Sequence, residues 1–299
     1  MNRRTLLGAL PLLTTGLPLV GGTRTQDMFG KKARLKPAIC AYSYRKELAD
    51  KSLSYGDLVR VAVDHGIDGL DLTVYWFPNT EDSFLMPLRR LAYINGVDIY
   101  SISVRTNLCQ NDASKRQEQV QEIKKWVDVA AKLGAGHIRI FGGTVPKGST
   151  NADAIGWCVE VLKVASDYAA SHGVILGLEN HGGITDYAKD IVEIVTKVNS
   201  DYVGINLDTG NFKENPIPQI EMCLPYAVAA QYKTNIASAN SKERVKSDWD
   251  KLTGMFAASG YKGYLAVEYE DPEPTATAMP RLLAELRTLC AKHSSPIGS

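Results

Sequence analysis

Four apolar stretches of this chain lead into a polar side chain that could bind a metal ion or move a proton. Glu179 ends ILGLE and Asp208 ends INLD, while Gln231 follows AVAA and Glu268 follows LAV. Carboxylate and amide oxygens bind divalent cations, and carboxylates also act as general acids and bases. Burying three carboxylates together is costly unless a cation neutralises them. Any one of the four could instead cap a helix or pair with an arginine, but their recurrence predicts a divalent metal site.

The elements that must carry these residues are short, apolar and rich in β-branched side chains. Strands are expected at residues 37–44, 66–75, 96–104, 134–142, 173–180, 202–208, 227–234 and 263–270. Amphipathic stretches lie between them, such as residues 155–169, where apolar side chains recur at helical spacing. Several of these stretches end in a glycine just before the next strand, which is typical of a helix C-terminus.

Eight alternating strand and helix units predict an α/β fold, a single (β/α)8 TIM barrel. A doubly wound sheet is the alternative, but it usually carries a glycine-rich phosphate turn after its first strand. The chain has AYSYRKELAD there and contains no G-x-G-x-x-G or P-loop motif. Barrel chemistry takes place at the C-terminal ends of the strands, which is where the four polar residues stand.

Composition excludes several other classes of protein. The chain has 299 residues, of which 44% are hydrophobic, with 34 Lys and Arg against 33 Asp and Glu. This balance argues against a nucleic-acid partner, because binding to phosphates requires a basic face. No apolar run is long enough to predict a membrane span in the mature form. The five cysteines are scattered, which predicts buried free thiols and no disulfide framework.

The first residues have the pattern of a targeting segment. A basic start containing Arg3 and Arg4 precedes a short, mildly apolar run, so residues 1–25 are expected to be a twin-arginine-like signal peptide. A general secretory signal is the alternative. Residues 26–36 are expected to form a linker and residues 37–295 the barrel. The expected location is the bacterial periplasm.

Three motifs resemble a known family. LGLENHGG, LDTGNF and GYKGYLAVEYE resemble the xylose-isomerase-like barrels, also called sugar phosphate isomerases/epimerases, and the resemblance covers residues 37–292. It implies one divalent ion bound by Glu179, Asp208, Gln231 and Glu268. The sequence departs from the family at strand seven, where an H-x-K-D pattern is usual and QYKT stands here. The resulting all-oxygen ligand set favours Mn²⁺, with Mg²⁺ or Zn²⁺ as alternatives.

The resemblance also implies an activity. Glu179 and Glu268 would be the acid–base pair of an isomerase or epimerase that transfers a proton through a metal-stabilised enediolate. The substrate is expected to be an unphosphorylated sugar, keto-sugar or cyclitol, since no basic cluster or glycine-rich anion site stands at the strand ends. One alternative is a lyase or dehydratase acting on a 3-keto-glycoside or keto-inositol. Another is a non-catalytic, exported carbohydrate-binding barrel. Oligomerisation is left open.

Several other side chains are candidates for substrate binding. Lys233 shares a strand face with Gln231 and is expected to contact a substrate oxygen or to pair with Asp208. His181 and Asn211 are expected to bind sugar hydroxyls or to support the ligands. Arg139 is expected to form an ion pair with the carboxylates.

Aromatic residues follow the first two strands. Tyr42 and Trp76, with Tyr44, Tyr75 and Phe77, could form a wall against a sugar ring or simply pack at the barrel rim. The histidine of the fourth strand, His137, is expected to face the helices.

Overall fold

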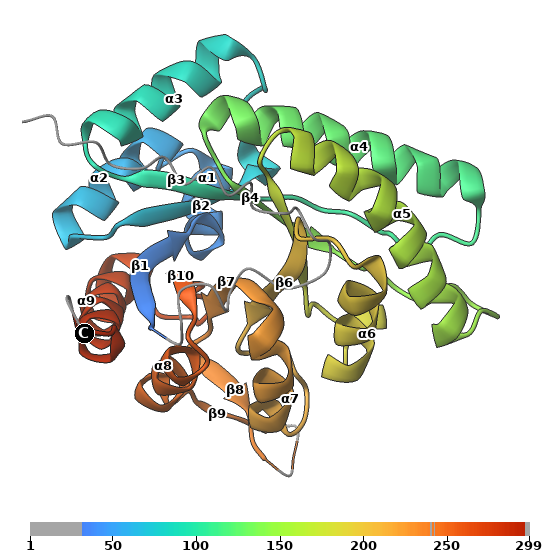
Figure 1. The fold of residues 1–299 in the computed structure, drawn as a ribbon. Helices are drawn as coiled ribbons and strands as arrows, with labels where there is room; N and C mark the ends of the chain where they lie inside the picture. Colours follow the sequence, from blue (N-terminus) through green and yellow to red (C-terminus); the bar gives the residue numbers. More distant parts are fainter. Residues whose placement is uncertain (1–31, 240, 242, 297–299) are drawn as a thin grey trace, which may run out of the picture.

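The computed structural model describes residues 32–239, 241 and 243–296. Within them, parallel strands close into one barrel in the order β1-β10-β7-β6-β5-β4-β3-β2 (Figure 1). The predicted single TIM barrel is therefore confirmed. Its strands are β1 (Arg34–Cys40), β2 (Gly69–Thr73), β3 (Asp98–Ser103), β4 (His137–Phe141), β5 (Ile175–Glu179), β6 (Val203–Asp208), β7 (Ala227–Tyr232) and β10 (Lys262–Val267).

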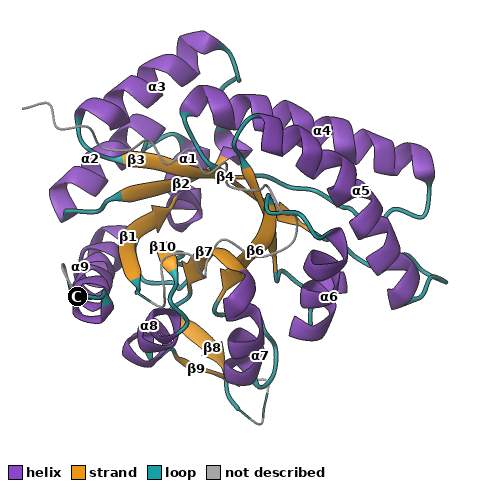
Figure 2. Ribbon diagram, viewed as in Figure 1, coloured by secondary structure: helices purple, strands orange, loops and turns teal. Residues whose placement is uncertain are grey.

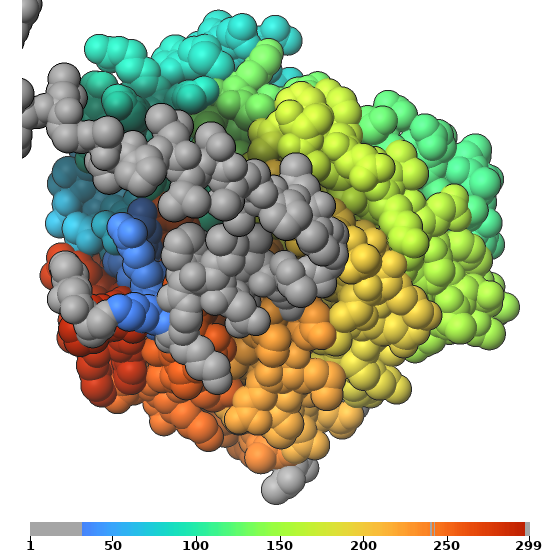
Figure 3. Space-filling model, viewed as in Figure 1, coloured from blue at the N-terminus to red at the C-terminus, as the bar shows by residue number. Residues whose placement is uncertain are grey.

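Helices surround this barrel (Figure 2). They are α1 (Arg45–Asp50), α2 (Tyr55–His65), α3 (Asp82–Ile94), α4 (Ala113–Leu133), α5 (Asn151–Ser171), α6 (Ala188–Val198), α7 (Pro216–Cys223), α8 (Trp249–Ala258) and α9 (Thr275–His293). Short 3-10 turns lie at Ala41–Tyr44, Val74–Trp76, Gly183–Thr185 and Leu224–Tyr226. An antiparallel ribbon of β8 (Asn235–Ala237) and β9 (Arg244–Lys246) follows β7. In space-filling view, the successive units follow one another around the molecule (Figure 3).

Local signals explain where these helices begin and end. Ser54 and Thr150 each form a capping box with the aspartate three residues later, at the starts of α2 and α5. Gly66 and Gly134 adopt left-handed conformations that end α2 and α4, as the sequence predicts. None of the helices that the structure describes has the length and hydrophobicity of a membrane span.

Strand β1 begins at Arg34, inside the segment predicted as a linker. Its first residues pair with β10 from Arg34 onward, which explains the early start. The predicted signal peptide lies outside the described residues and stays a prediction. All five cysteines are buried and free, as expected.

Alternation along β4 decides which of its side chains enter the barrel. Arg139 reaches Glu179 on β5, so its side chain lies inside. His137 is two residues earlier, on the same face of the strand, and hydrogen-bonds Ser101 of β3. The expectation that His137 faces the helices is therefore wrong. The buried Ile138 and Ile140 point to the opposite face of the strand, where they pack in the apolar core.

Candidate functional site

A polar pocket of about 310 Å³ lies at the C-terminal ends of the barrel strands. Its position agrees with the rule that barrel chemistry takes place at this end. Seven of the ten predicted site residues line it, together with four residues that were not predicted as sites. The lining consists of Tyr42, Tyr75, Arg105, Arg139, Phe141, Glu179, His181, Asn211, Lys233, Glu268 and Glu270.

Lys233 lies at the centre of the acidic side of this pocket. Its ammonium nitrogen is 2.5 Å from Glu268 Oε1, 2.5 Å from Glu270 Oε2 and 3.5 Å from Asp208 Oδ2. Asp208 is fully buried, and Glu268 is 7% exposed. The ion pair expected between Lys233 and Asp208 is present, but it is the longest of three contacts with carboxylates.

Glu179 belongs to a second charged group, beside the first. Arg139 Nε lies 3.0 Å from Glu179 Oε2, and the amide of Asn211 donates to Glu179 Oε1 at 3.0 Å. Both members of the ion pair are almost wholly buried. Arg139 also donates to the Tyr75 hydroxyl and to the carbonyl of Val104, which fixes the guanidinium across the pocket floor.

Gln231 points into the barrel but belongs to a deeper network. Its Oε1 accepts a hydrogen bond of 2.8 Å from Asn206, and its Nε2 donates to Asp71 Oδ2 at 3.2 Å and to Cys40 Sγ at 3.5 Å. The Ser103 hydroxyl donates to both Asp71 oxygens. Asp71 was not among the predicted site residues, although an aspartate inside the apolar stretch GLDLT was a visible signal.

These contacts decide whether the expected ligands fit a metal ion. A metal site needs several ligand atoms that point at one open position. Here Glu268 and Asp208 face an ammonium, Glu179 faces a guanidinium, and the Gln231 carbonyl faces Asn206. Throughout the described part of the chain, no three His, Cys, Asp or Glu side chains are grouped so that they could hold a metal. The side-chain arrangement therefore does not fit the expected centre.

The two glutamates have opposite electrostatic environments. Burial raises the pKa of Glu179 well above its usual value, and Arg139 only partly offsets this effect. Burial also opposes ionisation of Glu268, but the adjacent ammonium of Lys233 outweighs it and lowers the pKa of that carboxyl. Burial raises the pKa of Asp208 to about 7. Glu268 is thus a stronger acid than an ordinary glutamate, and Glu179 is a weaker one.

Lys233 remains protonated in this environment. Burial lowers the pKa of its ammonium, but the charges of Glu268, Asp208 and Glu270 raise it well above its usual value. Glu270 was not predicted as a site residue. Its position two residues after Glu268 in VEYE was a signal that could have identified it, because alternate residues of a strand share a face.

Aromatic and cationic side chains form the rest of the pocket. Tyr42 and Tyr75 line it, whereas Trp76 stacks on Tyr42 with ring centroids 6.0 Å apart and lines a neighbouring cavity instead. His181 stacks on Phe141 at 4.0 Å. Of the expected aromatic wall, Tyr42 and Tyr75 therefore line the pocket, and Trp76 does not.

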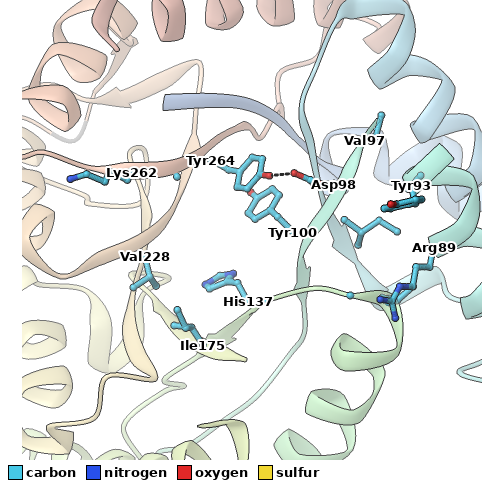
Figure 4. Close-up of a pocket in the computed structure, with 16 residues that line it drawn as sticks. Arg89, Tyr93, Val97, Asp98, Tyr100, His137, Ile175, Val228, Lys262 and Tyr264 are labelled. Atoms are coloured by element: carbon cyan, nitrogen blue, oxygen red, sulfur yellow. Dashed lines mark hydrogen bonds between the residues drawn. The ribbon is translucent and has the colours of Figure 1, made fainter. Parts of the chain in front are cut away.

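A second cavity, of about 470 Å³, lies at the opposite end of the barrel, where the strands begin (Figure 4). Tyr100 and Tyr264 stack there with ring centroids 4.0 Å apart, and the Tyr264 hydroxyl donates to Asp98. His137 is buried beside them, and its Nε2 has no hydrogen-bond partner. This end of a TIM barrel commonly serves stability.

Comparisons with known proteins agree with this architecture. A family model described as xylose isomerase-like TIM barrel matches residues 59–289. No curated protein sequence matches the chain.

Solved structures also resemble it. The IolI protein with a bound zinc atom has a TM-score of 0.70 at 19% identity, covering 87% of this chain and 100% of its own. D-psicose 3-epimerase with D-tagatose, from Clostridium cellulolyticum H10, has a TM-score of 0.67 at 16% identity, with coverages of 86% and 97%. The 3-keto-D-glucoside 4-epimerase YcjR from E. coli has a TM-score of 0.67 at 14% identity, with coverages of 86% and 99%. At these identities the likeness shows the fold alone.

Proposed function

The chain belongs to the xylose isomerase-like TIM barrel family, and from this premise we propose that it is a carbohydrate isomerase or epimerase. The proposed reaction moves a proton at a carbon next to the carbonyl of an unphosphorylated sugar, keto-sugar or cyclitol. Two of the similar structures are described as epimerases of such molecules. They are a precedent for this chemistry on the same fold.

One observation carries the proposal. Two carboxyl groups, one with a lowered pKa and one with a raised pKa, line the same small polar pocket as a charged lysine. Pairs of acidic groups whose environments push their pKa values apart are typical of acid–base catalysis. A protein that only bound sugars would have no need for this arrangement of buried charges.

The chain's own residues can perform each step. Glu268, held ionised by Lys233, would accept the proton from the carbon next to the carbonyl. The ammonium of Lys233 would stabilise the negative charge that develops on the carbonyl oxygen. Glu179, whose raised pKa favours its protonated form, would then deliver a proton to the carbon that becomes the new stereocentre or to its neighbour.

The pocket also indicates the class of substrate. Its volume of about 310 Å³ is at the small end of the range for ligand pockets. Arg139 and Lys233 are both paired with carboxylates, so neither is free to bind a phosphate group. Tyr42 and Tyr75 offer aromatic surface to one face of a sugar ring.

Deuterium exchange tests the proposal. In deuterated water, the wild-type protein is expected to wash deuterium into the carbon next to the carbonyl of a keto-sugar or keto-cyclitol, detected by proton NMR. Glu268→Gln removes the base and should lower the exchange rate about 100-fold or more. Glu285→Gln, on the exposed face of α9, is the matched control and should exchange at the wild-type rate.

A second variant separates the two carboxyl groups. Glu179→Gln should still exchange deuterium through Glu268 but should form little of the isomerised product, because it cannot return the proton. Loss of water or of an alcohol, in place of an epimer, would favour the lyase alternative. Absence of exchange with every carbonyl sugar tested, despite binding, would overturn the enzymatic proposal in favour of a binding protein.

A further inference from the structure

Lys233 occupies a position that is built to hold it. Its backbone carbonyl accepts a hydrogen bond of 2.9 Å from Trp249 Nε1, and its amide donates to Thr209 Oγ1 at 3.1 Å. Its side-chain stem passes over Gly210, where an added Cβ would lie 2.4 Å from the lysine Cγ. Only 6% of the residue is exposed. Contacts therefore hold both the backbone of Lys233 and the stem of its side chain in place.

The charged end of Lys233 joins carboxylates from different parts of the barrel. Asp208 ends β6, whereas Glu268 and Glu270 follow β10, and all three contact one nitrogen. The ammonium nitrogen of Lys233 is thus surrounded by three carboxylate oxygens, as a bound metal ion is surrounded by its ligands. The position is filled by an atom of the chain itself.

Both buried cations of the pocket are already paired with carboxylates. Lys233 and Arg139 together supply two positive charges, as many as one divalent ion. They face the buried or partly buried carboxylates of Asp71, Glu179, Asp208, Glu268 and Glu270. A divalent ion would therefore have to displace cations that are already paired and anchored.

Gln231, the fourth residue expected to bind the metal, uses its side-chain amide for other hydrogen bonds. The amide of Gln231 is held between Asn206 and Asp71, below the carboxylates that contact Lys233. An amide oxygen that accepts a hydrogen bond from Asn206 loses that bond if it turns to a metal. The neutral glutamine is thus used to connect buried polar groups.

We propose that Lys233 takes the place of the divalent metal, so that this barrel neutralises its carboxylates and polarises its substrate with an ammonium group. The part that concerns polarisation rests on the proposed function, whereas the part that concerns metal binding does not. The substrate oxygen that approaches Lys233 would be a carbonyl or hydroxyl oxygen of the sugar, which accepts the N–H that is not donated to Glu268 or Glu270.

Metal content of the wild-type protein tests the inference. The full chain is dialysed against EDTA, equilibrated with Mn²⁺ or Zn²⁺ in separate samples, and passed through gel filtration before elemental analysis. Far less than one ion per chain should remain. The Tm should not change with either ion, whereas a site at about 100-fold its Kd would raise it by about 5 °C. One retained ion per chain, or such a rise, would overturn the inference.

Removal of the Lys233 charge provides the converse test, because the variant should gain metal binding. Lys233→Met keeps the length of the stem but removes the charge, so three carboxylates are left without their cation. This variant should gain binding of Mn²⁺ or Zn²⁺ and a Tm that rises with the ion. Lys197→Met, which removes an exposed ammonium paired with Glu193 on α6, is the control and should gain nothing. A folded Lys233→Met protein that binds neither ion would contradict the inference. If this variant does not fold, the wild-type measurement decides.

The two proposals can fail separately. If the wild-type protein exchanges deuterium only after metal is added, the proposed reaction still holds and the role given to Lys233 is excluded. If the wild-type protein binds no metal and exchanges no deuterium into any keto-sugar, the replacement of the metal by Lys233 still holds and the proposed reaction is excluded.

Discussion

At the scale of single residues, the neighbours of a charge determine what it does in this barrel. Glu179 and Glu268 are the same residue type, and both are buried, yet the pKa of one is raised and that of the other lowered. The difference follows from Lys233, which donates a hydrogen bond to Glu268 but not to Glu179. A proton-transfer pair arises when one of two similar groups is ionised and the other is not.

His137 allows a prediction at this scale. Burial lowers the pKa of its imidazole from 6.5 to about 3. Between these values, the unfolded chain binds a proton that the folded protein does not, so the free energy of unfolding falls as the pH is lowered from 6.5. The loss should reach about 2 kcal/mol between pH 7 and pH 5.

The variant His137→Asn tests this pH dependence. Asparagine can retain a hydrogen bond to Ser101 but has no proton to gain. Urea unfolding at both pH values should show that the variant loses about 2 kcal/mol less than the wild type on acidification. Equal losses in the two proteins would show that His137 does not titrate as proposed.

At the scale of elements, glycines permit strands and side chains to approach closely inside the barrel. A Cβ at Gly177 of β5 would lie 2.1 Å from His137 Nε2. A Cβ at Gly69 of β2 would lie 2.5 Å from the ring of Tyr264, which is itself stacked on Tyr100. These positions are constrained by side chains from other strands and not by backbone conformation.

Gly69→Ala should therefore destabilise the protein. The two stacked rings leave Tyr264 little freedom to move, so overpacking should cost about 1–3 kcal/mol. Gly136→Ala is the matched control, since an added Cβ there meets no atom within 4 Å. Its free energy of unfolding should change by less than about 0.5 kcal/mol. Urea denaturation followed by circular dichroism measures both, and equal stabilities of the two variants would contradict the packing argument.

At the scale of the whole molecule, the two ends of the described chain meet where the barrel closes. β1 pairs with β10 in register from Arg34 to Ile39. Just after α9, Ser294 Oγ accepts a hydrogen bond of 3.0 Å from the amide of Leu35, and Ser295 Oγ accepts one of 2.9 Å from the amide of Ala33. The segment that follows the last helix thus holds the start of the first strand.

Removal of both hydroxyls should loosen this closure. In the double variant Ser294→Ala/Ser295→Ala, two amides of buried residues lose their acceptors, which should cost about 1–3 kcal/mol. Thr288→Ala removes a hydroxyl that bonds only within α9 and should be nearly neutral. Thermal unfolding compares the three proteins. An unchanged Tm for the double variant would show that water replaces the serines at no cost.

The periodic features of this protein could be predicted from its sequence. Apolar strands that alternate with amphipathic helices predicted the barrel, since a buried parallel strand and a helix require different spacings of apolar residues. Motifs at strand ends also predicted that Glu179, Glu268 and Lys233 would be close together, and they line one pocket. Helix ends were predictable because glycines mark them locally.

Which charges pair could not be predicted from the sequence. Glu268 and Lys233 are 35 positions apart, and Glu179 and Arg139 are 40 apart, so their contacts depend on the register between strands. The direction of the Gln231 amide depends on Asp71 and Asn206, which lie on other strands. Sequence motifs record the residue types at strand ends, whereas distances in three dimensions determine whether a carboxylate faces an open site or an ammonium.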